Sequence, residues 1–180
     1  MTSTTSQPST EPPSSTLDTA QPSVTLSLQD RLRASDVKRW HIVATNRTQS
    51  VADHSYRVAV IAGELATEMG WMNVDKWQVM AMAIAHDQHE ALYGDIPTPA
   101  KRQPLELPDN WHEKLVKVAD IIECYTWFWF NKDQFNVHSS KVCIYLEDRV
   151  NEMMDQLSPQ LHKVASEVIR TLKRDAGTIL

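Results

Sequence analysis

The stretch that decides the fold is SVADHSYRVAVIAGELATEMG, residues 50–70. Ser50 and Asp53 have the spacing of a capping box, in which two side chains satisfy the first free amides of a helix. Gly70 suits the position just beyond a helix end, where a left-handed backbone is common. Between these ends, apolar residues recur at helical spacing at Val58, Ile61, Leu65 and Met69. The stretch therefore predicts an amphipathic helix with one buried face.

Further helices are predicted on both sides of this stretch. Ser27-Leu-Gln-Asp30 has the same capping form, and Asn73 is expected to cap a helix that ends near Gly94. Prolines at positions 97, 99, 104 and 108 then mark an irregular connection.

After that connection the pattern is again helical. Asp109 or Asn110 is expected to cap a helix that runs to about Asn131, and two amphipathic helices follow. The last begins at Ser158-Pro159, an N-cap followed by a proline in the first helical position. No segment shows the alternation of a half-buried strand. The predicted fold class is all-α, a single helical bundle of about five to six helices.

Composition limits the domain organisation and the partners. The 180 residues suffice for one sizeable core, and 42% of them are hydrophobic. Residues 1–23 are rich in Ser, Thr and Pro, so we expect a disordered tail there and one domain over residues 24–180. A formal net charge of −5 argues against polymeric nucleic acid and anionic membranes as partners. With two cysteines, no secretory signal and no long apolar run, the cytoplasm is the expected location.

Polar residues interrupt three apolar segments that are otherwise typical of helices. His54 heads the apolar stripe described above, Asp120 lies on a second such segment, and the adjacent pair His86 and Asp87 lies on a third. A lone inward histidine is more often a hydrogen-bonded core residue, and a lone helical aspartate is usually solvated. Two imidazoles and two carboxylates in one apolar bundle, however, are donors that hold a divalent cation. The set predicts a metal-dependent enzyme.

Longer motifs surround these four residues. They are Arg39-Trp40, SVADHSYRVA at residues 50–59, HDQHEALYGDIPTP at residues 86–99 and KVAD at residues 117–120. Together they resemble the HD-domain phosphohydrolases of the 5′-deoxynucleotidase type, and the string H-D-x-x-E-x-x-x-G-D-x-P-T-P is far more specific than His-Asp alone. Short phage enzymes that remove triphosphate from dATP are also similar, including an Ile two residues after the Trp, as Ile42 follows Trp40. The similarity covers roughly residues 28–150.

The resemblance implies an all-helical HD domain that hydrolyses the 5′-phosphate ester of small deoxynucleotides, dNMP or dNTP, with a purine such as dATP favoured. The products would be the deoxynucleoside with phosphate or triphosphate. A divalent cation is implied, held by His54, His86, Asp87 and Asp120, and Zn, Co, Mn, Ni or Fe would suit these donors. Mg or a second cation could accompany the substrate phosphates. A phage-encoded enzyme of this kind would work in the host cytoplasm.

Two acidic residues are expected to take catalytic roles. Glu90 lies four residues after His86, on the same face of the expected helix, and is the candidate to pass a proton to the leaving 5′-oxygen. Asp95, just past the helix end, is expected to orient water or hold a second cation. An exposed helical glutamate is the simpler alternative for Glu90, but the face shared with His86 argues against it.

Substrate contacts are expected from aromatic and basic residues. The indole of Trp40 is expected to stack on the base beside Ile42, while the Arg39 guanidinium engages a phosphate. Without the resemblance, a core tryptophan beside a solvated arginine would be favoured. Further candidate phosphate contacts are Lys101, Arg102 and Lys117.

Two departures from the family pattern bear on the site. His89 stands where the family usually has a small residue, so it is either an extra imidazole near the site or a solvent-facing side chain. The interval from His86 to Asp120 is shorter than in the bacterial deoxynucleotidases, which favours a more open pocket that admits a dNTP.

The aromatic run YTWFWF at residues 125–130 bears on assembly. It covers more than one helical face, which predicts a homo-oligomer through this helix, with a fully buried central helix as the equal alternative. For function, the alternative is a catalytically silent HD-type module that binds a nucleotide or a partner. The presence of Glu90 and all four candidate ligands argues against it.

Overall fold

Helices make up the regular structure in the computed structural model, which describes residues 25–95, 97 and 104–176. The described elements are α1 (Leu28–Leu32), the 3₁₀ turn η1 (Arg33–Ser35), α2 (Val51–Glu68), α3 (Asn73–Ala85), α4 (Glu90–Tyr93), α6 (Trp111–Asn131), α7 (Val137–Asp155) and α8 (Pro159–Ala176). Within these residues, extended pairing is limited to two isolated bridges, Lys38 with Ser50 and Thr45 with Lys132. The all-α prediction is confirmed. No helix in this part of the chain is long and apolar enough to span a bilayer.

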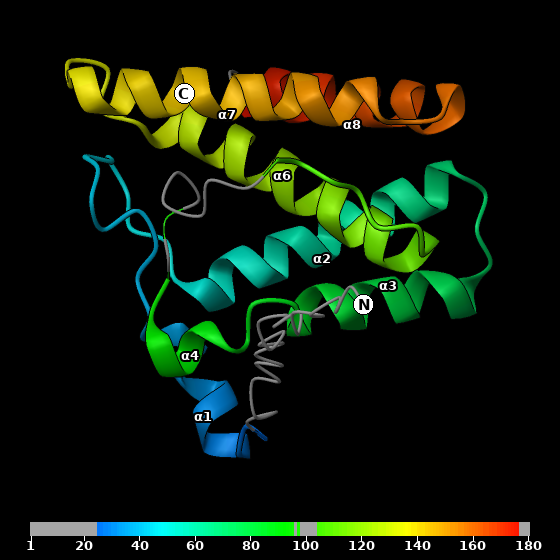
Figure 1. Cartoon of the computed structure of the whole chain (residues 1–180), viewed down its shortest axis with the longest axis horizontal. Helices are drawn as coiled ribbons and strands as arrows, with labels where there is room; N and C mark the ends of the chain where they lie inside the picture. The colour runs from blue at the N-terminus through cyan, green and yellow to red at the C-terminus, as the bar shows by residue number, and fades with distance from the viewer. Residues whose placement is uncertain (1–24, 96, 98–103, 177–180) are drawn as a thin grey trace, which may run out of the picture.

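The longest helix, α6, runs through the middle of the bundle (Figure 1). It contacts α2 and α3 on one side and α7 and α8 on the other. The short helices α1 and α4 lie together at one end, and both contact η1. Residues from α2, from the segment after α3 and from α6 can therefore meet near that end.

Burial around α6 explains its aromatic run. Tyr125, Trp127 and Phe128 are each 5% exposed or less, because α2, α3, α7 and α8 surround the helix. Trp129 remains 40% exposed. Most of the aromatic run therefore packs within the bundle, which agrees with the alternative of a buried central helix. A homo-oligomer stays a prediction, and the aromatic run no longer supports it.

Local capping chemistry fixes the helix starts. Ser50 and Asp53 form the expected capping box at the start of α2, and Ser27 forms one with Asp30 at the start of α1. The side chain of Asn110 accepts hydrogen bonds from two amides of the first turn of α6. Ser158 Oγ accepts from the amide of Leu161 at 3.4 Å at the start of α8. These predicted starts are confirmed.

The connection from α2 to α3 brings one confirmation and one correction. Gly70 has a φ of +76°, which suits glycine, and it follows the C-cap as predicted. Asn73 does not cap α3, because Met72 already takes the extended N-cap conformation and Asn73 is the first helical residue. The helix therefore begins one residue earlier than the sequence predicted, with no side-chain cap.

Close packing between α2 and α3 depends on Gly63. A Cβ at this position would lie 2.9 Å from Sδ of Met80, nearer than real Cβ contacts allow. The missing side chain lets α3 lie tightly against α2.

Candidate metal centre and active site

The first candidate ligand comes from the opening turn of α2. The capping box at Ser50 fixes where the helix begins, and the amide of His54 donates to the Ser50 carbonyl at 3.0 Å. His54 is fully buried, as its place at the head of the apolar stripe predicted. Its ring lies 5.2 Å from that of His86, between centroids.

The second segment differs from the prediction. The sequence predicted one helix from the region of residue 73 to Gly94, but α3 ends at Ala85 and residues 86–89 form turns before α4. The Ala83 carbonyl, which a continuing helix would offer to the amide of Asp87, accepts a 2.6 Å hydrogen bond from Nδ1 of His86. The amide of Glu90 donates instead to the Asp87 carbonyl, in a tighter three-residue turn.

This break has a geometric consequence for the site. In a regular helix His86 and Asp87 would point about 100° apart. In the turn, both side chains reach one place: His86 Nε2 lies 3.2 Å from Asp87 Oδ2, and His54 Nε2 lies 3.4 Å from the same oxygen.

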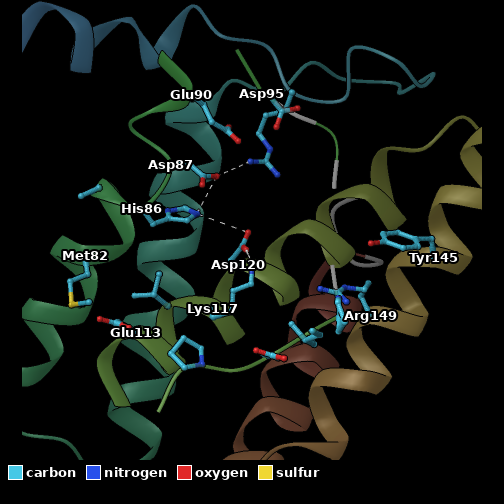
Figure 2. A pocket seen from close by; sticks show the side chains of 17 residues that line it. Met82, His86, Asp87, Glu90, Asp95, Glu113, Lys117, Asp120, Tyr145 and Arg149 are labelled. Atoms are coloured by element: carbon cyan, nitrogen blue, oxygen red, sulfur yellow. Dashed lines mark hydrogen bonds and ion pairs between the residues drawn. The ribbon is translucent and has the colours of Figure 1, made fainter. Parts of the chain in front are cut away.

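The third segment is α6, which contributes Asp120. Asp120 Oδ1 lies 3.3 Å from His54 Nε2. The same oxygen lies 4.0 Å from His86 Nε2 (Figure 2). Its other oxygen, Oδ2, accepts from Lys117 Nζ at 2.7 Å. Atoms of His54, His86 and Asp120 are close enough to hold one cation, and Asp87 adjoins them. The structure thus brings together all four predicted metal-binding residues.

Hydrogen bonds on the far side of each ring fit these residues to a metal. His54 Nδ1 lies 2.7 Å from the Glu123 carboxylate, and His86 Nδ1 faces the Ala83 carbonyl. Both of these partners are acceptors, so each ring donates through Nδ1. Both Nε2 atoms are buried and have no hydrogen-bond partner among the described residues. Two Nε2 atoms beside two carboxylates are a donor set that suits a divalent cation.

The electrostatics of the cluster favour a positive charge. Burial and Arg39 lower the pKa of His54, but the neighbouring carboxylates of Asp120, Asp87 and Glu123 outweigh them and raise it to about 10. Burial alone would raise the pKa of Asp87, yet the two neighbouring histidine rings bring it well below its ordinary value. The carboxylates stay ionised. Their negative charge favours a proton on His54, and the same charge would stabilise a metal cation bound beside them.

A large cavity adjoins the cluster. Its volume is about 770 Å³. Among its lining residues are His86, Asp87, Asp120, Glu90, Asp95, Arg39 and Lys117, with Met82, Glu113, Tyr145 and Arg149 further along its walls. Figure 2 shows Tyr145 and Arg149 on α7, across the pocket from Met82 and Glu113. The cavity thus borders three of the four candidate ligands directly.

The two predicted catalytic acids both border this cavity. Glu90 is 2% exposed and lies at the start of α4, next to the turn that holds His86 and Asp87. Its place follows from that turn and not from a helical face shared with His86. Asp95 has 9% of its side chain exposed, and its Oδ2 lies 3.9 Å from His41 Nδ1.

The expected substrate residues are placed unevenly. Arg39 is 9% exposed, its Nη1 donates to Asp87 Oδ2 at 3.2 Å, and it borders the large cavity. Trp40 and Ile42 border a small neighbouring cavity of about 30 Å³. One face of Trp40 stacks on Trp127 with a 1° interplanar angle, so that face serves core packing. Stacking of Trp40 on a base stays a prediction.

The basic residues expected to contact phosphate divide into two groups. Lys117 borders the large cavity, and the charge of Asp120 raises its pKa. Lys101 and Arg102 lie outside the described residues. His89 is exposed, in agreement with the solvent-facing alternative for this extra imidazole.

Sequence reasoning missed a buried polar network behind the cluster. Glu123 is fully buried on α6, and besides His54 it accepts from Gln49 Nε2 at 2.8 Å and from Arg57 Nε at 2.6 Å. A signal was present, because Glu123 is a single charge in the apolar run IIECYTW. Arg149 and Tyr145 were missed because α7 showed only an ordinary amphipathic pattern.

The fold and the site together define the class of HD-domain phosphohydrolases. Its features here are an all-helical frame, histidines and aspartates brought together from three segments, and an adjoining cavity. Comparisons with known proteins place the chain within this class. The model of the YfbR-like 5′-deoxynucleotidase family matches residues 29–113. A dATP triphosphohydrolase of Salmonella phage PMBT28 is 30% identical over 166 residues, covering 76% of this chain and 82% of that protein. The chain belongs to this family of HD-domain hydrolases.

Two further comparisons agree with this assignment. The 5′-deoxynucleotidase YfbR of Shigella flexneri serotype 5b is 38% identical over 94 residues, 48% of this chain and 47% of that protein. The solved structure of the cyanophage S-2L HD phosphohydrolase DatZ, bound to dA and one catalytic Zn²⁺ ion, aligns with a TM-score of 0.69 at 22% identity. That alignment covers 83% of this chain and 98% of the cyanophage chain, and it supports the fold.

Proposed function

We propose that the protein hydrolyses the 5′-phosphate ester of deoxynucleotides and releases the deoxynucleoside with phosphate or triphosphate. The observation that carries this proposal is the convergence of two histidine Nε2 atoms and two aspartates beside a cavity of nucleotide size. Relatives named dATP triphosphohydrolase and 5′-deoxynucleotidase, and a structural neighbour bound to dA, support the same class of substrate.

The proposed cation ligands are His54, His86, Asp87 and Asp120. A divalent cation bound by them supplies polarisation of the phosphate oxygens and a water of lowered pKa. Zn²⁺ is the first candidate, since the cyanophage neighbour is described with one catalytic Zn²⁺. Co, Mn, Ni and Fe also suit imidazole and carboxylate donors, and Mg or a second cation could travel with the substrate phosphates.

Two acids divide the proton chemistry in this proposal. Glu90 faces the cavity beside the cluster and gives a proton to the 5′-oxygen as the deoxynucleoside leaves. Asp95 lies between the two cavities and orients water at the phosphate. Burial of Glu90 keeps bulk water from competing for that proton.

Positive groups around the cavity favour a substrate with several phosphates. Arg39, Lys117 and Arg149 lie on different walls, from the segment before α2, from α6 and from α7. A monophosphate would engage few of them, while a triphosphate can reach several. We propose dNTP acceptance with a purine preferred, the base lying toward Trp40 and Ile42. Lys101 and Arg102 remain candidate contacts.

The decisive experiment separates metal, base and phosphate number. Chelator-treated protein is reloaded with single metals and offered dAMP, the four dNTPs and ATP, and products are separated by anion exchange. The expected result is deoxyadenosine with triphosphate from dATP. Release of orthophosphate from dAMP with dATP untouched would reject the triphosphate proposal. Binding of both nucleotides without any hydrolysis would favour the silent module.

Variants assign the roles. His86→Ala should lose both metal binding and turnover. Glu90→Gln should keep the metal and lose turnover by roughly 10²–10⁴-fold, the usual contribution of a positioned acid or base. Glu64→Gln, an exposed glutamate on α2, is the matched control and should retain activity.

Assembly and location complete the proposal. A homo-oligomer is tested by light scattering at micromolar concentration, where a monomeric mass rejects it. The proposed setting is the cytoplasm, or the host cytoplasm if the gene is carried by a phage, as the similarity to phage enzymes suggests.

A further inference from the structure

The carboxylate of Glu123, which is not among the residues that line the large cavity, contacts Nδ1 of the His54 ring. Glu123 is 0% exposed and lies 2.7 Å from Nδ1 of His54 through Oε2. Its Oε1 accepts from Gln49 Nε2 and from Arg57 Nε. Both oxygens are therefore occupied, and the charge is balanced by a guanidinium.

We infer that Glu123 is a positioning residue that holds His54 with Nδ1 protonated and Nε2 directed at the cation. An ionised carboxylate accepts and cannot donate, so it fixes which ring nitrogen carries the proton. It also makes the opposite nitrogen a stronger donor to a metal. The inference rests on the proposed function, because it takes His54 to be a cation ligand.

The same carboxylate ties the metal centre to the expected base-binding segment. Gln49 donates to Glu123 through Nε2 and accepts from Trp40 Nε1 through Oε1, each at 2.8 Å. Its amide group is thus fixed in one orientation by two different partners. Trp40, Gln49, Glu123 and His54 form one continuous hydrogen-bonded chain, so Glu123 sets the position of a ligand and of the Trp40 indole together.

A second cluster of potential cation ligands also includes His54. His54, Glu123 and Cys124 also lie close enough to form a cluster, and Cys124 Sγ donates to Asp120 Oδ1 at 3.5 Å. Glu123 is occupied there by Arg57 and Gln49, and Cys124 Sγ lies 3.2 Å from Nη2 of Arg39. The guanidinium of Arg57 beside Glu123 and that of Arg39 beside Cys124 disfavour a cation bound between these two residues. Glu123 therefore acts through His54 and is not itself a ligand.

The test measures zinc affinity and not turnover. Circular dichroism first checks that each variant is folded. Zn²⁺ affinity is then measured by competition with a chromophoric chelator. Glu123→Gln keeps the shape but brings an NH₂ donor that can turn toward Nδ1, so we expect about 10–100-fold weaker binding. In zinc-loaded protein labelled with ¹⁵N-histidine, a protected Nδ1 proton of His54 should be present and should be lost or shifted in Glu123→Gln.

Three controls separate the outcomes. Thr126→Val changes another buried polar residue of α6 and should leave zinc affinity within about threefold of the original. If Glu123→Gln binds zinc as tightly as Thr126→Val does, the inference is overturned. Cys124→Ser should also bind normally, and a loss of zinc there would overturn the inference by making the trio of His54, Glu123 and Cys124 the cation site. His54→Ala must lose zinc, since unchanged binding would remove the ligand assignment itself.

Discussion

Replacing Gln49 with leucine should show how strongly the buried network holds the segment before α2. Gln49 is 1% exposed, and the change removes one hydrogen bond to the Glu123 carboxylate and one from the Trp40 indole. A hydrogen bond to a charged group contributes about 1.5–3 kcal/mol, and a buried donor left unpaired costs about 1–3 kcal/mol. Burial of the leucine side chain returns part of this, about 1.5–3 kcal/mol. The net expectation is a loss of about 2 kcal/mol.

The assay is equilibrium urea unfolding of the metal-free chain, with Gln78→Leu on the exposed face of α3 as the matched control. The control should change the free energy of unfolding by less than about 0.5 kcal/mol. Trp40→Phe removes the indole donor, so the Gln49 change should cost about 1 kcal/mol less in that background. Equal costs in both backgrounds, or a Gln49 variant as stable as the control, would refute the network.

Three further predictions concern stability and metal. Ser50→Ala should lower the free energy of unfolding by about 1 kcal/mol through loss of the α2 capping box, while Ser27→Ala on the short, exposed α1 should cost less; urea unfolding would contradict this if the order were reversed. Phe128→Ala removes a fully buried ring against Trp40 and should cost about 3–5 kcal/mol by the same measurement, a loss under 1 kcal/mol being incompatible with the described core. Zinc at 100 times its Kd should stabilise the native chain by about 2.7 kcal/mol in calorimetry, an effect that His86→Ala should abolish.

Helix starts were readable from the sequence because they depend on neighbours. The side chains of Ser50 and Asn110 accept hydrogen bonds from amides two or three residues away, and Gly70 takes a positive φ just after the end of α2. The four candidate ligands were also readable, since polar residues on apolar helix faces need partners. Asn73 failed as a cap because Met72 had already taken the extended conformation.

The remaining errors came from interactions across the fold. The break after Ala85 accompanies a local hydrogen bond from His86 to the Ala83 carbonyl, while the other side of its ring meets the carboxylates of its neighbour Asp87 and of Asp120 on α6. Helical periodicity cannot foresee that choice. Glu123 was overlooked because its partners Gln49 and Arg57 lie 74 and 66 positions away.

Separation along the chain has a consequence for folding. His54 bonds to Glu123 across 69 positions, and Arg39 reaches Asp87 across 48, so the cluster does not exist until α2, the turn after α3 and α6 have docked. A ligand that binds only this assembled arrangement has little to bind in an early transition state. Zinc should therefore leave the refolding rate almost unchanged and should slow unfolding, because it stabilises only the fully assembled bundle.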